Sequence, residues 1–428
     1  MNAARLPLLV PAVMFFHGGL LAGPYSAGMN DPANASDAPV PGFTGPDGIG
    51  GARIDDGFGG FLHPRNYVNP LFFGWASTVE DYSPAPGVSG GFTDETFALG
   101  PVTGDNFHIV SLGDLNAAQI SSGALPGSIT LHFANPIRNL TGADFTVFEN
   151  ALLADAGGIF GELGYVEASS DGVNFVRFPS ASLSADVAPA ERAYRTINPT
   201  DVFNLAGKHV NGNGESWGTP FDLAAVGLAS ASYIRIVDIP GSGAFRDSAN
   251  RPIYDAWVTF GSGGFDLEAV GAISRAITFD QWQTVRGLAG AQRGAAVDVE
   301  KDGVPNFLEY AFARLPNRVD ESAAPTTTEI AAGRLVITFT RDERASDLKY
   351  EIQAANDLAA NAWTTIAQST AGAPTVAAGV FTPSIIETNA SAIASVGVLR
   401  KVRVADVQTV AGNARRFLRI KVTSIPVP

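Results

Sequence analysis

Hydrophobic and polar residues alternate along most of this chain in short runs. Between residues 127 and 133, Ile129, Leu131 and Phe133 alternate with polar residues, which is the period of a strand with one buried face. Similar runs occur at 143–150, 164–179, 232–239 and 263–273, and again at 334–341, 348–356, 362–367, 398–406 and 415–423. Because Gly- and Asp-rich turns separate them, the pattern predicts a mainly β protein built as an antiparallel sandwich or jelly roll.

The pattern becomes helical after residue 276. Thr278 is placed as an N-cap and Gln281 stands three residues later, which is the spacing of a capping box. We therefore expect a short helix over about 279–288. A second helical run follows at 307–315, and an acidic loop lies between the two helices.

These changes of pattern divide the chain into five parts. We predict a signal peptide at 1–28, a large jelly-roll-like β-sandwich with an extended lead-in at 29–275, a helix–calcium loop–helix connector at 276–316, a linker at 317–329 and a small C-terminal β-sandwich at 330–428.

The loop between the helices, DVEKDGVPNFLE, has the spacing of a calcium loop. Such loops supply oxygens from positions 1, 3, 5, 7, 9 and 12, with glycine at position 6 for the turn. The corresponding ligands are Asp298, Glu300, Asp302, the carbonyl of Val304, Asn306 and Glu309, with Gly303 at the turn. The spacing predicts bound Ca²⁺, and the alternative is a solvated turn that caps a helix.

Two residues depart from the pattern of paired EF-hands. Glu300 stands where Asp or Asn is usual, and its extra methylene crowds the ion. Pro305 has no N–H with which to pair a second loop. We therefore expect a lone loop of the dockerin or thrombospondin type 3 kind.

Composition narrows the classes of protein. The 428 residues carry a formal net charge of −14, and 46% are hydrophobic. The acidic balance argues against nucleic acid and anionic membranes as partners and suits cation binding. With no cysteine, the chain has no disulfide, thiolate metal site or cysteine nucleophile. Bound calcium is therefore expected to stabilise the fold in place of disulfides. The sequence leaves the oligomeric state open.

The first residues have the features of a secretory signal peptide. Arg5 precedes the apolar stretch 6–16, and small residues follow between Gly23 and Gly28. The alternative is a buried N-terminal strand or helix. Because no later run is long and apolar enough to span a bilayer, we expect an exported protein, secreted or held at the cell surface, without a transmembrane segment in the mature chain.

Several polar loops carry candidate binding or catalytic residues. Glu149 and Glu162 are candidates for the acid and base of a glycosidase, although ordinary loop polarity explains them too. The Gly-rich segment 207–223 offers a sugar platform or a structured loop that folds back on the sandwich. The carboxylates of the segment 246–266 offer a further structural calcium site, and its Trp257 is a second candidate aromatic platform. The candidate ligand-binding residues of the two segments are His209, Trp217, Asp222, Asp247, Asp255 and Trp257.

Longer stretches carry a resemblance to a known group. The runs ADFTVFENAL, GYVEASSDGVNFVRFP, YIRIVDIPGSG, DSANRPIYDAW and GSGGFDLEAVGAI, within residues 70–275, resemble a domain of exported bacterial cell-surface proteins. These proteins occur in Verrucomicrobia, in Planctomycetes and in chains with a PEP-CTERM sorting tail. The resemblance implies a secreted β-sandwich and no established activity. The final residues RIKVTSIPVP depart from such a tail, so anchoring through it is not expected.

Together these observations predict an exported, non-enzymatic surface or matrix protein with a structural calcium site. Its expected role is binding or adhesion, with extracellular polysaccharide as the ligand. The alternatives are a carbohydrate-active enzyme that uses Glu149 and Glu162, and a purely structural coat component.

Overall fold

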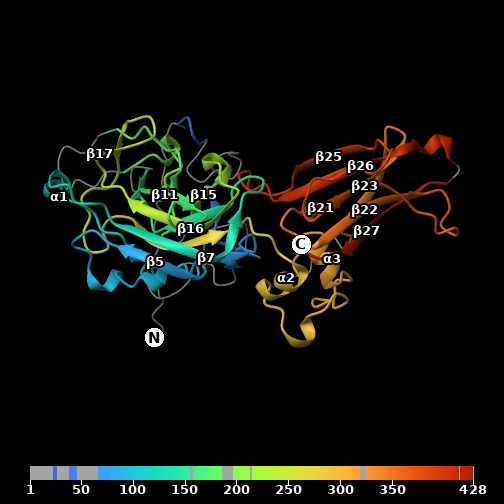
Figure 1. Ribbon diagram of the computed structural model, residues 1–428, viewed down its shortest axis with the longest axis horizontal. Helices are drawn as coiled ribbons and strands as arrows, with labels where there is room; N and C mark the ends of the chain where they lie inside the picture. The colour runs from blue at the N-terminus through green and yellow to red at the C-terminus, as the bar shows by residue number, and fades with distance from the viewer. Residues whose placement is uncertain are drawn as a thin grey trace, which may run out of the picture.

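The computed structural model describes residues 23–26, 38–45, 66–154, 158–185, 196–212, 215–318, 324–413 and 415–427. Antiparallel sheets make up most of this part of the chain, and its helices are few and short. The predicted mainly β class, with a large jelly-roll-like sandwich and a smaller C-terminal sandwich, is confirmed. Figure 1 shows the two β domains end to end, with the connector helices below their junction.

The large domain consists of two facing antiparallel sheets. The first sheet has the order β1-β15-β8-β19-β4, and β6 also pairs with β19. Its strands are β1 (Val40–Pro41), β15 (Trp217–Phe221), β8 (Phe145–Glu149), β19 (Asp266–Ala272), β4 (Gly74–Trp75) and β6 (Val110–Ser111). The second sheet, β12-β11-β16-β7-β5, consists of β12 (Val176–Arg177), β11 (Gly164–Ser169), β16 (Ser230–Asp238), β7 (Ser128–Arg138) and β5 (Thr78–Ser83).

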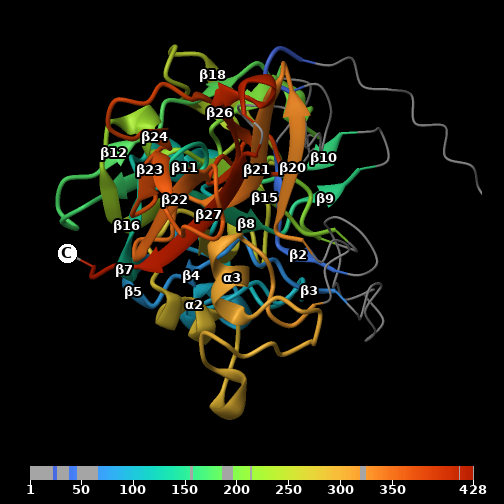
Figure 2. The same ribbon diagram turned by 90° about the vertical axis from the view of Figure 1, so that its right-hand side faces the viewer.

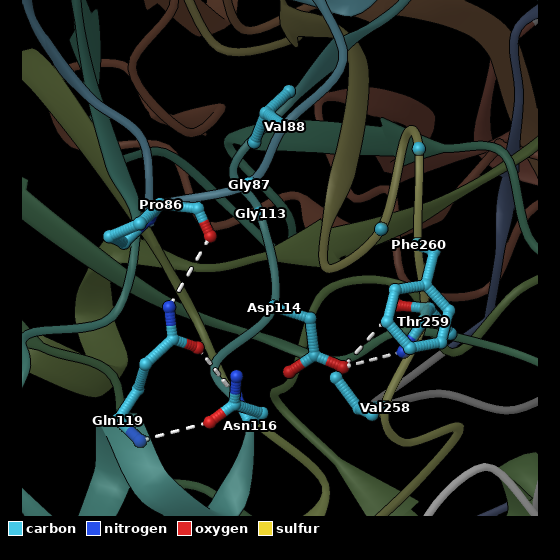
Figure 3. Close-up of a pocket in the computed structure, with 12 residues that line it drawn as sticks. Pro86, Gly87, Val88, Gly113, Asp114, Asn116, Gln119, Val258, Thr259 and Phe260 are labelled. Atoms are coloured by element: carbon cyan, nitrogen blue, oxygen red, sulfur yellow. Dashed lines mark hydrogen bonds between the residues drawn. The ribbon is translucent and has the colours of Figure 1, made fainter.

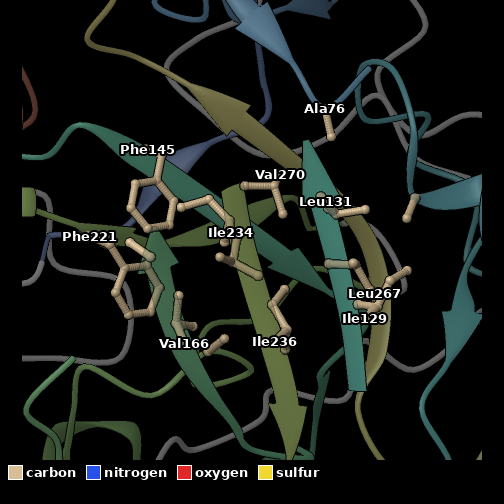
Figure 4. Close-up of a cluster of buried hydrophobic side chains, with 14 of the residues drawn as sticks. Ala76, Ile129, Leu131, Phe145, Val166, Phe221, Ile234, Ile236, Leu267 and Val270 are labelled. Carbon is tan, nitrogen blue, oxygen red and sulfur yellow. The ribbon is translucent and has the colours of Figure 1, made fainter. Parts of the chain in front are cut away.

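The main core fills the space between these two sheets (Figure 4). Alternate residues of β7 and β16 point inward, among them Leu131, Ile234 and Ile236, and meet Phe145 of β8. All five residues of β8 are buried, because its other face packs Phe148 into a second cluster. The first sheet is therefore covered on both faces.

Four two-stranded sheets and a short helix lie around the large domain. The sheets pair β2 (Phe43–Thr44) with β3 (Tyr67–Val68), β9 (Leu152–Leu153) with β10 (Ile159–Phe160), β13 (Ala181–Ser182) with β14 (Val202–Phe203), and β17 (Ser242–Arg246) with β18 (Pro252–Tyr254). The helix α1 spans Ala117–Ser121, and Asn116 caps it.

The C-terminal domain packs two four-stranded antiparallel sheets together. One contains β20 (Thr326–Ala331), β21 (Arg334–Asp342), β26 (Leu399–Thr409) and β25 (Ser384–Asn389), and the other contains β24 (Val376–Ala377), β23 (Thr364–Thr370), β22 (Leu348–Ala355) and β27 (Phe417–Ser424). Phe339 of β21 stacks on Tyr350 of β22 with ring centroids 5.9 Å apart. This stack joins the two sheets at the core.

The connector contains two short helices on one side of the C-terminal domain (Figure 2). The helix α2 spans Phe279–Val285, and the predicted capping box between Thr278 and Gln281 is present. It ends earlier than predicted because Gly287 follows with φ of +72°. The helix α3 spans Asn306–Ala311, shorter than the predicted run, since Ala313 takes a φ of +58°.

A shared apolar cluster joins the two β domains. Ile393, Val396 and Val398 of the C-terminal domain are buried with Phe43 and Phe148 of the large domain. Two backbone hydrogen bonds cross the same boundary, from Ala143 N to Ser395 O at 2.7 Å and from Gly397 N to Thr141 O at 3.1 Å. The domains therefore contact each other directly, in addition to being joined by the connector.

Most of the predicted signal peptide lies outside the described residues. Its described part, 23–26, contacts the large domain: Gly23 N donates to Oγ1 of Thr200 at 2.7 Å, and Tyr25 stacks on Phe203. Among the helices of the described ranges, none is long and apolar enough to cross a bilayer.

Candidate functional site

The acidic loop between α2 and α3 is a tight turn organised by Asp298. Its Oδ1 accepts hydrogen bonds from Lys301 N at 2.7 Å and Asp302 N at 3.2 Å, and its Oδ2 accepts one from Gly303 N at 2.9 Å. Lys301 and Gly303 both have positive φ, 64° and 94°. The backbone thus curls around the first carboxylate, and Gly303 stands where the predicted turn needs it.

Three carboxylates of this loop converge. Asp298, Glu300 and Asp302 each offer an oxygen, and these atoms lie within 4.8 Å of one another. Both oxygens of Glu300 and Oδ2 of Asp302 are shielded from solvent and have no hydrogen-bond partner among the described residues. Like charges this close repel one another unless a cation lies between them. The side chain of Glu300 thus brings its carboxylate close to those of Asp298 and Asp302.

A buried amide oxygen accompanies the carboxylates. Asn306, the first residue of α3, is fully buried, and its Nδ2 donates to Gln292 O at 2.8 Å and Gly294 O at 3.2 Å. These bonds fix the amide plane and turn Oδ1 to the opposite side. That oxygen is buried without a hydrogen-bond partner among the described residues. An orphaned buried acceptor is costly, so Asn306 points independently to a missing cation or water.

The two remaining predicted ligands are also buried. Val304 is 3% exposed, and Glu309 in the first turn of α3 is 0% exposed. The cluster within 4.8 Å contains the carboxylates of positions 1, 3 and 5. Coordination by Glu309 and by the carbonyl of Val304 stays a prediction.

The two tryptophans of the predicted sugar platform have different surroundings. Trp217 begins β15, is half-buried, and its Nε1 donates to Oε2 of Glu215 at 2.6 Å. Trp257 is buried, and its Nε1 donates to Leu115 O at 2.8 Å. The indole of Trp257 therefore anchors a loop inward, whereas Trp217 keeps part of its ring accessible beside a carboxylate.

The other candidate residues of these segments organise backbone. Asp222 caps a 3-10 helix at Leu223–Val226 through Ala224 N at 2.8 Å, and burial raises its pKa. Asp247 is buried and accepts from Nε of Arg251 at 2.7 Å, and Oδ2 of Asp255 accepts from Leu163 N at 2.8 Å. His209 is buried too. These contacts explain the side chains as parts of the fold.

Glu149 and Glu162 are buried at one end of the large sandwich. Glu162 accepts hydrogen bonds from the hydroxyl of Thr259 and from Gly264 N, and Glu149 accepts one from Ala151 N at 2.9 Å. Burial, followed by the charge of Asp266, raises the pKa of both carboxyls well above the ordinary value. A glycosidase needs its carboxyls beside an accessible sugar, and these two are only 2% and 6% exposed.

A small cavity of about 160 Å³ is lined by Thr259, which donates a hydrogen bond to Glu162, and by Asp114 (Figure 3). Oδ2 of Asp114 accepts from Thr259 N at 3.0 Å, and Thr259 in turn donates to Glu162. The ring of Phe260 stands at the mouth and is 57% exposed. Sequence pattern gave no signal for this cavity, because its walls come from three separate segments of the chain, within 86–88, 113–119 and 258–263.

No protein-family model and no curated protein matches this chain. The side chains themselves must therefore indicate its function. Within the described part of the chain, the three converging carboxylates and the buried oxygen of Asn306 point most directly to a ligand.

Proposed function

We propose that this chain is an exported, non-enzymatic surface or matrix protein whose connector holds a structural Ca²⁺ ion. The convergence of Asp298, Glu300 and Asp302 within 4.8 Å carries the proposal. Ca²⁺ takes six to eight oxygens and tolerates irregular geometry. The proposed ligands are Asp298, Glu300, Asp302, the carbonyl of Val304, Asn306 and Glu309.

The ion would have a structural role, because the loop leads directly into the core of the C-terminal domain. Tyr310 of α3 packs on Trp282 of α2 with ring centroids 5.6 Å apart. Ala311 O accepts a hydrogen bond from the hydroxyl of Tyr350 in β22 at 2.5 Å. Neutralising the loop would hold α3 at a fixed angle to α2, and both helices against this domain.

Binding or adhesion to extracellular polysaccharide is the activity we propose, in keeping with the resemblance to exported bacterial surface proteins. The absence of cysteine and the net charge of −14 suit a calcium-rich environment outside the cell. The partly accessible ring of Trp217 beside Glu215 suits a sugar ligand. The deep burial of Glu149 and Glu162 favours binding over hydrolysis.

Calcium-dependent thermal unfolding tests the metal site. With a dissociation constant on the order of 10⁻⁴ to 10⁻³ M, 10 mM Ca²⁺ should stabilise the wild type by about 1 to 3 kcal/mol relative to EDTA. The Asp302→Asn variant should not be stabilised by calcium in this way. Asp81→Asn, an equal charge change at an exposed position of β5, should keep the stabilisation.

Magnesium at the same concentration controls for ionic strength. Because Mg²⁺ demands a smaller, more regular octahedron, it should give little of the effect. A wild-type protein that melts identically in EDTA and in calcium, or an Asp302→Asn variant that gains as much as the wild type, would refute the site.

A further inference from the structure

A cavity of about 410 Å³ lies at the junction of the large domain and the connector. Aromatic side chains of the large domain form one wall, and the end of α2 forms the other. Its lining includes Tyr67, Phe72, Trp75, Val285, Arg286 and Asn317. The rings of Phe72 and Trp75 pack together with centroids 4.7 Å apart, and Tyr67 and Trp75 are half-buried. The cavity thus combines an apolar wall with one cation.

Arg286 is held rigidly at this wall. Its Nη1 donates to Pro70 O at 2.8 Å, and its guanidinium lies 4.7 Å from the centroid of the Phe73 ring. Its Nε is buried and has no hydrogen-bond partner among the described residues. The buried Nε cannot reach a ligand, but a guanidinium carries five N–H donors in a planar fork, so Arg286 has the hydrogens of Nη2 and the second hydrogen of Nη1 left for one.

The charges around Arg286 do not balance. The charged side chains that act on it are Arg344 and Asp342. The carboxylate of Asp342 is already engaged by Arg344, with Nε at 2.8 Å and Nη2 at 2.7 Å from its oxygens. Burial, and then the charge of Arg344, lower the pKa of Arg286 to about 9, and Asp342 opposes this only in part. A partly buried positive charge without its own counter-ion among the described residues, in a chain of net charge −14, attracts an anion.

We propose that this junction cavity binds a carboxylate-bearing sugar ring, as a uronic acid residue of an acidic polysaccharide presents. The carboxylate pairs with the fork of Arg286, which matches its geometry. The apolar face of the ring lies against the aromatic wall that includes Trp75. The choice of a sugar rests on the polysaccharide-binding role proposed above, whereas the need for an anion follows from Arg286 alone.

Val285 offers a test that leaves the buried groups in place. This residue lines the cavity, ends α2 and is 40% exposed. Val285→Glu puts a competing carboxylate at the cavity, and Val285→Gln is its neutral match in size. Arg286→Gln removes the proposed partner directly. Thermal melts of all three variants show whether the fold is kept.

Titration calorimetry in EDTA, with trigalacturonate as the probe, measures binding without calcium bridges. We expect trigalacturonate to bind the wild type and Val285→Gln. Val285→Glu and Arg286→Gln should bind it about 10- to 100-fold more weakly. Neutral galactotriose offers the sugar rings without a carboxylate, and acetate offers a carboxylate without a ring. Both should bind far more weakly than trigalacturonate. Because the pairing is ionic, added salt should weaken binding.

A parallel assay with immobilised polysaccharides, acidic and neutral, separates the two proposals. If the wild type binds polysaccharide and both Val285→Glu and Arg286→Gln bind it equally well, the cavity is not the site, while the binding role stands. If the wild type binds no polysaccharide and no trigalacturonate, both proposals fall. Equal affinity for acetate and trigalacturonate would refute the sugar and leave a simple anion site.

Discussion

The hydroxyl of Tyr310 donates a hydrogen bond to Oδ1 of Asp347 at 2.6 Å, and this pair joins the connector to the C-terminal domain. Oδ2 of the same carboxylate accepts from the backbone N–H of Phe279, the first residue of α2, at 2.9 Å. Both side chains are buried. Burial, and then the hydrogen bond to Asp347, raise the pKa of Tyr310 far above its ordinary value. One carboxylate therefore holds both connector helices.

Removing this hydroxyl should destabilise the protein. Tyr310→Phe leaves the charged acceptor Asp347 buried with one fewer donor, so we expect the free energy of unfolding to fall by about 1 to 3 kcal/mol. Asp347→Ala should lower the free energy of unfolding further, because Phe279 of α2 and Tyr310 of α3 both lose their hydrogen bond to this carboxylate. Urea unfolding followed by fluorescence measures both changes.

Tyr233→Phe is the matched control, because the ring of Tyr233 packs on His132 and its hydroxyl has no hydrogen bond among the described residues. It should unfold as the wild type does. A Tyr310→Phe variant as stable as Tyr233→Phe would show that the bond to Asp347 contributes nothing.

Glu300 should respond to substitution with opposite signs in the presence and absence of calcium. Its two oxygens have no hydrogen-bond partner among the described residues and lie close to Asp298 and Asp302. In EDTA, Glu300→Gln relieves repulsion and should melt at a higher temperature than the wild type. In 10 mM calcium the Glu300→Gln variant lacks one of the proposed ligand charges. Its melting temperature should therefore rise less on adding calcium than that of the wild type. Scanning calorimetry in both buffers measures the reversal.

Glu300→Asp is the conservative comparison, since aspartate is usual at this position of a calcium loop. It should keep the calcium response of the wild type. If Glu300→Gln were destabilising in EDTA, the carboxylate would have a structural partner and the repulsion argument would fail.

Several of the strands that the sequence predicted have one buried face. β7, β16 and β22 alternate apolar and polar residues because one side of each packs into a core. In contrast, β5, β20 and β25 were missed, and β20 begins inside the predicted linker 317–329. These strands lie at sheet edges and are mostly exposed, so their sequences carry no apolar period. Backbone pairing with a neighbour forms them instead.

Candidate site residues were predictable from the sequence only where they lie close together along the chain. The proposed ligands of the acidic loop lie within twelve consecutive residues, so the sequence pattern alone was enough to predict them. Arg286 and Trp75 are 211 positions apart, and only the packing of α2 against the large domain brings them to one cavity. Trp257 was a candidate platform because its loop is polar, but its indole N–H bonds inward to Leu115.

The buried carboxyl of Asp266 should make the large domain more stable in acid than in base. Burial raises the pKa of Asp266 to about 7, although hydrogen bonds from Ser262, Ser111 and Asn150 lower it in part. A carboxyl whose folded pKa exceeds its unfolded value of 3.8 binds its proton more tightly in the native state. Its stabilising effect is complete below about pH 4 and is lost as the pH rises through about 7.

Asp266→Asn tests this dependence, because an amide is a neutral mimic of the protonated acid. At pH 8 the variant should exceed the wild type in free energy of unfolding by on the order of 1 to 3 kcal/mol, at pH 5 by less, and below about pH 4 the difference should vanish or reverse. Denaturant titrations across this range measure it. Asp171→Asn is the control: hydrogen bonds from Asn174 lower the pKa of this exposed carboxyl, so its variant should gain nothing at pH 8. A constant difference between Asp266→Asn and the wild type from pH 5 to pH 8 would mean that Asp266 does not titrate there.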